Sequence, residues 1–248
     1  MKISILLFTL FAGLFFWKAT SFKTEQLKYS RVRTAYLEKE NRVKSLLKNK
    51  GLDSKHLEIF IRAFKSEKCL ELWGKNKTDE KFQLITSYDF CTTSGNLGPK
   101  RQEGDLQIPE GFYHINQFNP WSKFYLSLGI NYPNASDKIL GVQQRLGNHI
   151  FIHGNCITIG CIPVTDDKIK ELYLFAVEAK NNGQHKIPVH IFPARLNEQK
   201  LQALRERYST RQTLTSFWQN LKDGFDHFEN THTLPKVTVA QNGSYMFH

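Results

Sequence analysis

The chain has 248 residues, of which 40% are hydrophobic and 23% are charged. This length allows one sizeable domain with a terminal appendage or two small domains, and the ordinary composition excludes disorder throughout the chain. A net charge of +11 favours an anionic partner, such as an acidic polymer, a membrane surface or nucleic acid. Nucleic acid is not expected, because no zinc-finger or RNA-binding motif and no arginine-rich block with interleaved aromatic residues is present.

The amino terminus indicates export. Lys2 precedes an apolar run over residues 3–17, which is too short for a full membrane span but typical of a secretory signal. Residues 19–21 offer only a weak cleavage site, so residues 1–21 are predicted to be a signal peptide or an uncleaved signal anchor. We therefore expect a periplasmic protein, or one anchored to the outer side of the cytoplasmic membrane.

The next segments change from helical to strand periodicity. Residues 22–56 form a lead-in region, in which apolar residues recur at helical spacing over residues 30–50 and Gly51 ends the helix. Alternating apolar and polar residues then predict a meander of three strands. These strands are residues 58–64, 69–73 and 81–90.

A long connection, residues 91–111, interrupts this β region. Loops of that length inside a domain built from short connections tend to be functional. Further strands are predicted at residues 112–115, 123–130, 149–153 and 187–192. Pro188 argues that the last of these lies at a sheet edge, because proline cannot donate a ladder hydrogen bond.

The remaining elements are mostly helical. Thr165 is a good N-cap for a helix that ends at Gly183 and that crosses the β region. Two more helices are predicted at residues 197–208 and 213–228, and a tail of β character at residues 236–247. The predicted fold is mainly β (α+β), with a catalytic domain over residues 57–196 and a helical C-terminal extension over residues 197–248.

The segment from residue 149 to residue 166, HIFIHGNCITIGCIPVTD, carries the chemistry. A strand ends at His153-Gly154, and Gly160-Cys161 follows after a short return, eight residues later. A thiolate nucleophile needs a base that takes its proton, and an imidazole does this. The amides of Gly160 and Cys161, with that of Ile159, are candidates for an oxyanion hole. The pattern predicts acyl transfer through a thioester, without a metal or cofactor.

Both members of the pair have competitors. His149 is a second candidate base, although in a strand it lies one full repeat farther from Cys161. Cys156 is a second candidate nucleophile, but no glycine precedes it. In an oxidising compartment the four cysteines can form disulfides; a free Cys161 leaves at most one bridge among the others, and a Cys156–Cys161 bridge is the competing arrangement. A buried cysteine that only packs is the structural alternative.

Four stretches resemble the L,D-transpeptidase catalytic domain (YkuD-type) family, in particular its YafK-like branch. They span most of the region from about residue 59 to residue 196. The stretches are FIHGNCITIGCIPVTDDKIKELY, LGPKRQEGDLQIPEGFYHI, SLGINYPNASD and IPVHIFP. The resemblance implies a β-rich, sandwich-like fold in which His153 is the proton donor and acceptor, Cys161 the nucleophile, and Gly160 with Ile159 and Gly154 the oxyanion and substrate-binding positions.

The chain departs from the general family pattern of Ser-His-Gly-Cys-x-Arg. Thr158 replaces the serine, Ile159 the second histidine and Pro163 the arginine, as is typical of the YafK-like branch. An arginine beside the nucleophile can engage a substrate carboxylate. Lys100 and Arg101 are candidates for that role here, and solvated loop charges are the alternative.

The resemblance implies transpeptidation of peptidoglycan stem peptides, with roles in cell wall organization and cell shape. One alternative is a hydrolase of the same fold that cleaves crosslinks or releases a peptidoglycan-attached lipoprotein, since water or an amine can resolve the same thioester. A second alternative is a non-catalytic cell-wall-binding module. The expected partners are stem peptides and that lipoprotein, with membrane contact only through the N-terminal anchor.

Overall fold

A computed structural model describes residues 20–248, so the predicted signal segment lies almost entirely outside the described residues. No helix within residues 20–248 is long and apolar enough to cross a membrane. In chain order the elements are α1 (Phe22–Gln26), α2 (Ser30–Lys48), β1 (Leu57–Phe64), β2 (Cys69–Asn76), β3 (Gln83–Asp89), β4 (Gly111–Asn119), β5 (Ser127–Ile130), α3 (Ala135–Leu140), β6 (Phe151–His153), β7 (Ile162–Pro163), α4 (Asp166–Asn181), β8 (Ile187–Phe192), α5 (Glu198–Arg207), α6 (Gln212–Thr231), β9 (Val237–Val239) and β10 (Tyr245–Phe247).

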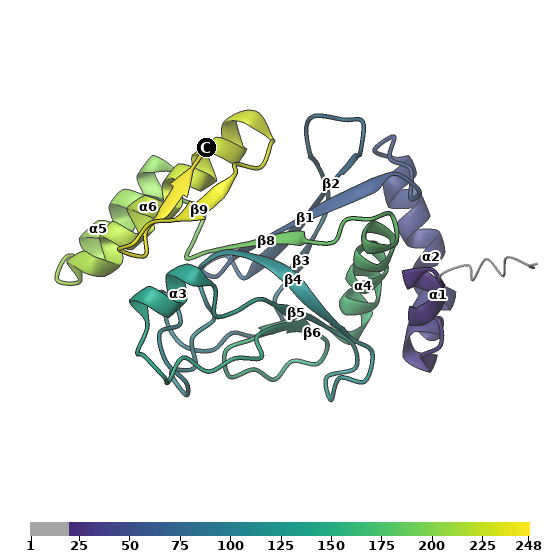
Figure 1. Cartoon of the computed structure of the whole chain (residues 1–248), viewed down its shortest axis with the longest axis horizontal. Helices are drawn as coiled ribbons and strands as arrows, with labels where there is room; N and C mark the ends of the chain where they lie inside the picture. The colour runs from purple at the N-terminus through teal and green to yellow at the C-terminus, as the bar shows by residue number, and fades with distance from the viewer. Residues whose placement is uncertain (1–19) are drawn as a thin grey trace, which may run out of the picture.

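The fold is α+β and mainly β in the predicted catalytic region, as expected. One curled sheet has the order β3-β2-β1-β8-β4-β5-β6-β7, and β9 pairs with β10 in a separate hairpin. The predicted meander is confirmed, because β1, β2 and β3 pair antiparallel in succession. The short strands β6 and β7 lie at the opposite end of the sheet order from this meander. Figure 1 labels β6 beside β5.

The predicted edge position of β8 is wrong. This strand lies inside the sheet, parallel to β1 and antiparallel to β4. Pro188 is tolerated because the ladder with β1 begins only at Val189. Before that point the Gln184 side chain substitutes for a strand, accepting a hydrogen bond from Ile59 N at 2.9 Å and donating to Ile59 O at 2.8 Å. The missing N–H of proline therefore leaves no ladder position unpaired.

Helices cover both faces of the sheet, which explains why all but one residue in each of β1 and β8 is buried. In β1 the apolar residues Ile59 and Ile61 belong to the core that includes α4, whereas Phe64 belongs to the core that includes α5 and α6. The predicted crossing helix is confirmed as α4, with the Thr165 side chain accepting from Lys168 N at its start. Helix α2 packs on the outer side of α4 (Figure 1).

The buried carboxylate of Glu110 joins the C-terminal extension to the long loop over residues 91–110. Glu110 is fully buried and accepts from Lys65 Nζ at 2.8 Å and from Gly98 N at 2.7 Å. Its second carboxylate oxygen accepts from the indole N–H of Trp218 in α6 at 2.8 Å. Buried charges persist when they are paired and fully hydrogen-bonded, as here. Helix α6 and the loop are therefore held in one position relative to the sheet.

Three local differences from the predicted elements concern the region before the chemistry-bearing segment. Helix α3 was not predicted; it begins at a capping box in which Asn134 and Asp137 exchange hydrogen bonds. Strand β5 begins only at Ser127, because Tyr125 has a φ of 70°. Strand β6 begins at Phe151, and His149 has a φ of 60°, so His149 does not share a strand with His153.

Candidate active site

The candidate site lies where β6 and β7 run parallel at the end of the sheet. Ile152 pairs with Ile162 and His153 with Pro163. One step before Ile162, Cys161 therefore lies beside Phe151, whose amide N–H donates to the Cys161 Sγ at 3.4 Å. Cys161 itself precedes β7, and its sulfur receives the N–H that Phe151 would otherwise donate to a strand backbone, two residues before His153 in β6.

His153 is held as a neutral imidazole. Its Nδ1 lies 2.5 Å from the Gly154 carbonyl oxygen, and because a carbonyl only accepts, Nδ1 carries the proton. The ring stacks on Phe124 with centroids 4.5 Å apart. Burial lowers the pKa of His153, with the Gly154 carbonyl opposing it. The buried Nε2 has no hydrogen-bond partner within residues 20–248 and presents a lone pair.

Cys161 is a half-buried free thiol. Besides the Phe151 amide, its Sγ contacts the His149 carbonyl oxygen at 3.8 Å. Burial raises the pKa of the Cys161 thiol, while the Phe151 N–H and the charge of Lys100 act in the opposite direction. The resting form at neutral pH is therefore a thiol, which needs a base to become a nucleophile.

The two candidate bases differ in placement relative to this thiol. Within residues 20–248 no hydrogen bond joins the Cys161 thiol to either imidazole ring. His149 is exposed and contacts the thiol through its backbone carbonyl, and its ring lies parallel to that of Phe151. His153 alone of the two is buried and has its tautomer fixed.

The loop before the nucleophile is organised by Thr158. Its hydroxyl oxygen accepts from Cys161 N at 2.8 Å and from Gly160 N at 3.2 Å, and it donates to Cys161 O at 2.9 Å. The two amides predicted for the oxyanion hole thus bond to Thr158 in this structure. The Ile159 side chain is 76% exposed. Gly160 has a φ of 135° and is needed as glycine, since a Cβ there would lie 3.0 Å from the Gln107 carbonyl oxygen.

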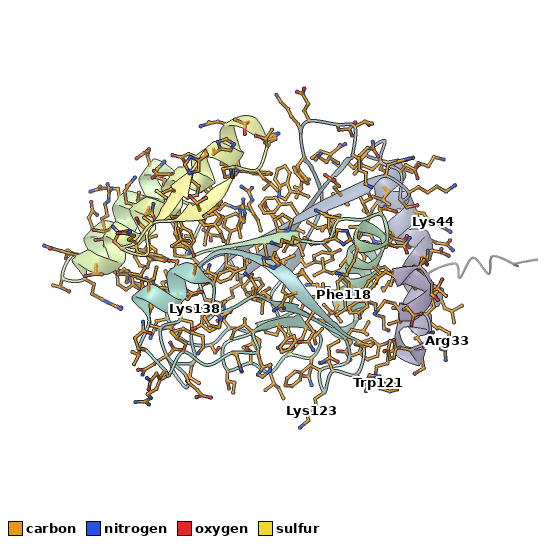
Figure 2. All side chains as sticks on the ribbon, viewed as in Figure 1. Arg33, Lys44, Phe118, Trp121, Lys123 and Lys138 are labelled. Carbon is orange, nitrogen blue, oxygen red and sulfur yellow. A yellow bond between two sulfur atoms is a disulfide. The ribbon has the colours of Figure 1, made fainter. Side chains whose placement is uncertain are left out.

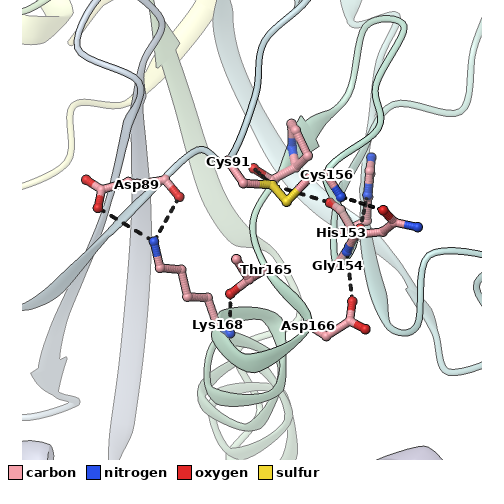
Figure 3. Close-up of a disulfide and its surroundings, with 10 residues drawn as sticks. Asp89, Cys91, His153, Gly154, Cys156, Thr165, Asp166 and Lys168 are labelled. Atoms are coloured by element: carbon pink, nitrogen blue, oxygen red, sulfur yellow. Dashed lines mark hydrogen bonds and ion pairs between the residues drawn. A yellow bond between two sulfur atoms is a disulfide. The ribbon is translucent and has the colours of Figure 1, made fainter.

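Gly154 has two roles: its carbonyl accepts the His153 hydrogen bond, and its lack of a side chain allows neighbouring segments to pack closely. A Cβ at this position would lie 2.4 Å from an Asp166 carboxylate oxygen and 2.9 Å from the Phe124 carbonyl oxygen. The same Asp166 oxygen accepts from Asn155 N at 2.8 Å, which ties the loop after β6 to the first turn of α4 (Figure 3).

A disulfide joins Cys91 to Cys156, across 65 residues of sequence (Figure 3). It links the start of the long loop to the residues that follow His153, and it leaves Cys69 and Cys161 free. The competing Cys156–Cys161 bridge is therefore wrong, and Cys156 is unavailable as a nucleophile. One bridge among the other three cysteines agrees with a free Cys161.

Removing this disulfide should lower the free energy of unfolding. The chain-entropy relation for a loop of this length gives a loss of about 4 kcal/mol in the free energy of unfolding. We expect that loss in the variant Cys91→Ser/Cys156→Ser, measured by chemical denaturation, with Cys69→Ser as the control that removes a thiol but no bridge. The double variant is preferable to a reductant, which acts on every cysteine. An unchanged free energy of unfolding would show that the bridge does not form.

Lys100 and Arg101, the two residues predicted to bind a substrate carboxylate, already bond to carboxylates of the protein. Lys100 is buried and donates to an Asp105 carboxylate oxygen at 2.7 Å and to the Gln102 carbonyl at 2.8 Å. Arg101 pairs with Asp137 at 3.3 Å and lies over the Phe217 ring at 4.8 Å. No cluster of three or more metal-ligating side chains lies within the described part of the chain.

The segment holds the groups that nucleophilic acyl transfer requires, because a free thiol contacts the Phe151 amide and an imidazole with an unpartnered Nε2 follows two residues later in β6. Sequence reasoning missed three contributors: Phe124 under the His153 ring, the Phe151 amide at the sulfur, and Gln107 against Gly160. None carries a motif of its own. Only the presence of Gly160 indicated that another backbone segment comes close.

Comparison with known proteins identifies the family to which this fold belongs. Residues 58–191 match the model of the YkuD L,D-transpeptidase catalytic domain. The chain is 39% identical over 190 residues to Putative L,D-transpeptidase YafK of Escherichia coli strain K12, covering 76% of this chain and 73% of that protein. The chain therefore belongs to the L,D-transpeptidase catalytic domain (YkuD) family and has a peptidoglycan-related function.

Two solved structures are also similar. The helical cell shape determining protein Pgp2 from Campylobacter jejuni has a TM-score of 0.45 and 19% identity, over 74% of this chain and 73% of that chain. Its K307A mutant has a TM-score of 0.44 and 23% identity, over 56% of this chain and 48% of that chain. This chain thus spans about half the length of the mutant structure.

Proposed function

We propose that the protein is an exported peptidoglycan L,D-transpeptidase in which Cys161 is the nucleophile and His153 the general base. The observation that carries the proposal is the free Cys161 thiol at the Phe151 amide, two residues before His153, whose Nδ1 is protonated and whose Nε2 is unpartnered. The segment lies within the region that matches the family.

The reaction follows from these protonation states. His153 Nε2 takes the Sγ proton as the sulfur attacks the carbonyl carbon of an amide at an L,D junction of a stem peptide. The tetrahedral intermediate collapses to a thioester on Cys161, and His153 returns the proton to the departing amine. An acceptor amine then attacks the thioester, forms the new amide and releases the thiol.

The Cys161 and Gly160 amides are our candidates for stabilising the oxyanion. To do so they exchange the Thr158 hydroxyl for the substrate oxygen. Such donors act strongly because they face developing charge in a site from which water is excluded. Thr158 then serves to hold the loop in the resting enzyme.

An extracytoplasmic location is supported by the disulfide and by the charge. Disulfides persist in oxidising compartments, and the Cys91–Cys156 bridge lies next to the proposed site. The net charge of +11 suits an anionic wall polymer.

The test is a product analysis. Purified protein incubated with stem peptides and an acceptor amine should yield the crosslinked amide with loss of the terminal residue, as resolved by chromatography and mass spectrometry. Products that contain water instead of the amine would favour the hydrolase, and release from lipoprotein-bearing peptidoglycan would identify its substrate. Binding to peptidoglycan without any new product would replace the enzyme by the wall-binding module.

A further inference from the structure

A cavity of about 800 Å³ lies beside the proposed active site, between the long loop and the C-terminal extension. The loop contributes Arg101 and Gln107, and the start of α6 contributes Arg211 and Phe217. Asn242, in the turn between β9 and β10, also lines it. Its volume is within the range of pockets that hold small ligands or a few peptide residues.

The cavity adjoins the catalytic loop. Gln107 lines it and places its carbonyl oxygen 3.0 Å from the position of a Cβ on Gly160, the residue before the nucleophile. Gln107 therefore connects the wall of the cavity to the loop that carries Cys161.

The charged residues that line the cavity are both arginines. None of the lining residues is an aspartate or glutamate. Arg101 is oriented by one ion pair with Asp137 at 3.3 Å and by the Phe217 ring, which leaves most of its five N–H donors free. Arg211 is exposed and makes no ion pair within residues 20–248. A guanidinium without a paired carboxylate favours an anionic ligand, and its fork of donors matches a carboxylate.

We propose that this cavity is a substrate subsite in which Arg211 and Arg101 bind a carboxylate of the peptide whose amide is attacked by Cys161. The inference rests on the proposed function and names how its substrate is held. The other lining side chains are amides and hydroxyls that can pair with a peptide backbone. They include Gln212, Thr213, Ser216, Asn220 and Ser244.

Lys100 does not share this role. Its ammonium donates hydrogen bonds to the Asp105 carboxylate and to the Gln102 carbonyl, so a substrate would have to displace both partners. The carboxylate site thus combines one arginine from the catalytic region with one from the C-terminal extension. Glu110, bonded to Lys65 and Trp218, fixes these two parts relative to each other.

The test measures binding in the full-length Cys161→Ala variant, so that no turnover occurs. A stem peptide with free carboxylates is titrated and its Kd determined by calorimetry. Adding Arg211→Gln should weaken binding about five- to tenfold, the size expected for one charge-assisted hydrogen bond. Arg211→Lys should weaken it less. Lys44→Gln, which removes a charge on α2, far from α5 and α6 (Figure 2), should leave Kd unchanged.

Two further measurements separate the possible outcomes. The same peptide with amidated carboxylates should bind weakly and should not respond to Arg211→Gln. Ser216→Trp, which fills the cavity from an exposed position on α6, should weaken binding of the free-carboxylate peptide. Equal affinity for the amidated peptide, or an Arg211→Gln variant that binds normally, overturns the subsite. Both results leave the proposed function intact if the wild-type protein still forms crosslinked product.

Discussion

Replacing Cys161 by alanine is expected to lower turnover by at least about 10³-fold and to abolish covalent labelling of the protein. The sulfur is the only atom in the proposed site that can form the thioester, and no other free thiol lies in the loop that follows β6. The measurement is intact-protein mass spectrometry after incubation with a thiol-reactive β-lactam of the carbapenem type, together with the product assay. Wild-type protein should gain one adduct.

Cys69→Ala is the matched control, since Cys69 is the other free cysteine within the described residues. Burial and the neighbouring Glu71 carboxylate raise the pKa of the Cys69 thiol, which suppresses its reactivity. This variant should be labelled and active like the wild type. Labelling that persists in Cys161→Ala and disappears in Cys69→Ala would refute the assignment of the nucleophile.

Much of the fold could be predicted because local patterns agreed with the tertiary structure. The alternation in β1 and β2 and the Thr165 cap of α4 are read from neighbouring residues, and both are present. The position of β8 could not be read in this way. It depends on the Gln184 side chain filling the ladder beside Pro188, which is a contact between segments far apart in the chain.

The candidate site shows the same division. The spacing of His153 and Cys161 indicated a common site, because a short return joins β6, which ends at His153, to β7, which begins one residue after Cys161. The partner of Cys156 was not predictable, since Cys91 lies 65 residues away. Nor did any pattern indicate that the Thr158 hydroxyl bonds the amides expected to receive the oxyanion. Such contacts depend on a loop conformation that only the folded chain defines.

The identity of the base gives the second large expected effect. His153→Gln should lower kcat/KM by about 10²- to 10⁴-fold, the usual contribution of a general base. His149→Gln should leave it nearly unchanged, because the exposed His149 ring makes no hydrogen bond to the thiol and the backbone carbonyl that contacts Sγ is kept. Steady-state kinetics of the two variants, made in the same background, provide the comparison.

The pH profile distinguishes a base from a residue that only packs. Burial lowers the pKa of His153 below its ordinary 6.5, so the neutral, proton-accepting form persists through neutral pH. Activity should therefore stay level as pH falls to 6.5 and decline only below it, when Nε2 becomes protonated. Burial raises the pKa of Cys161 above its ordinary 9.0, so alkylation of the thiol should still accelerate at pH 9. His153→Gln should remove the acid decline from the residual activity, whereas a variant that has only lost packing against Phe124 would retain it. If His149→Gln removes that decline instead, His149 is the base.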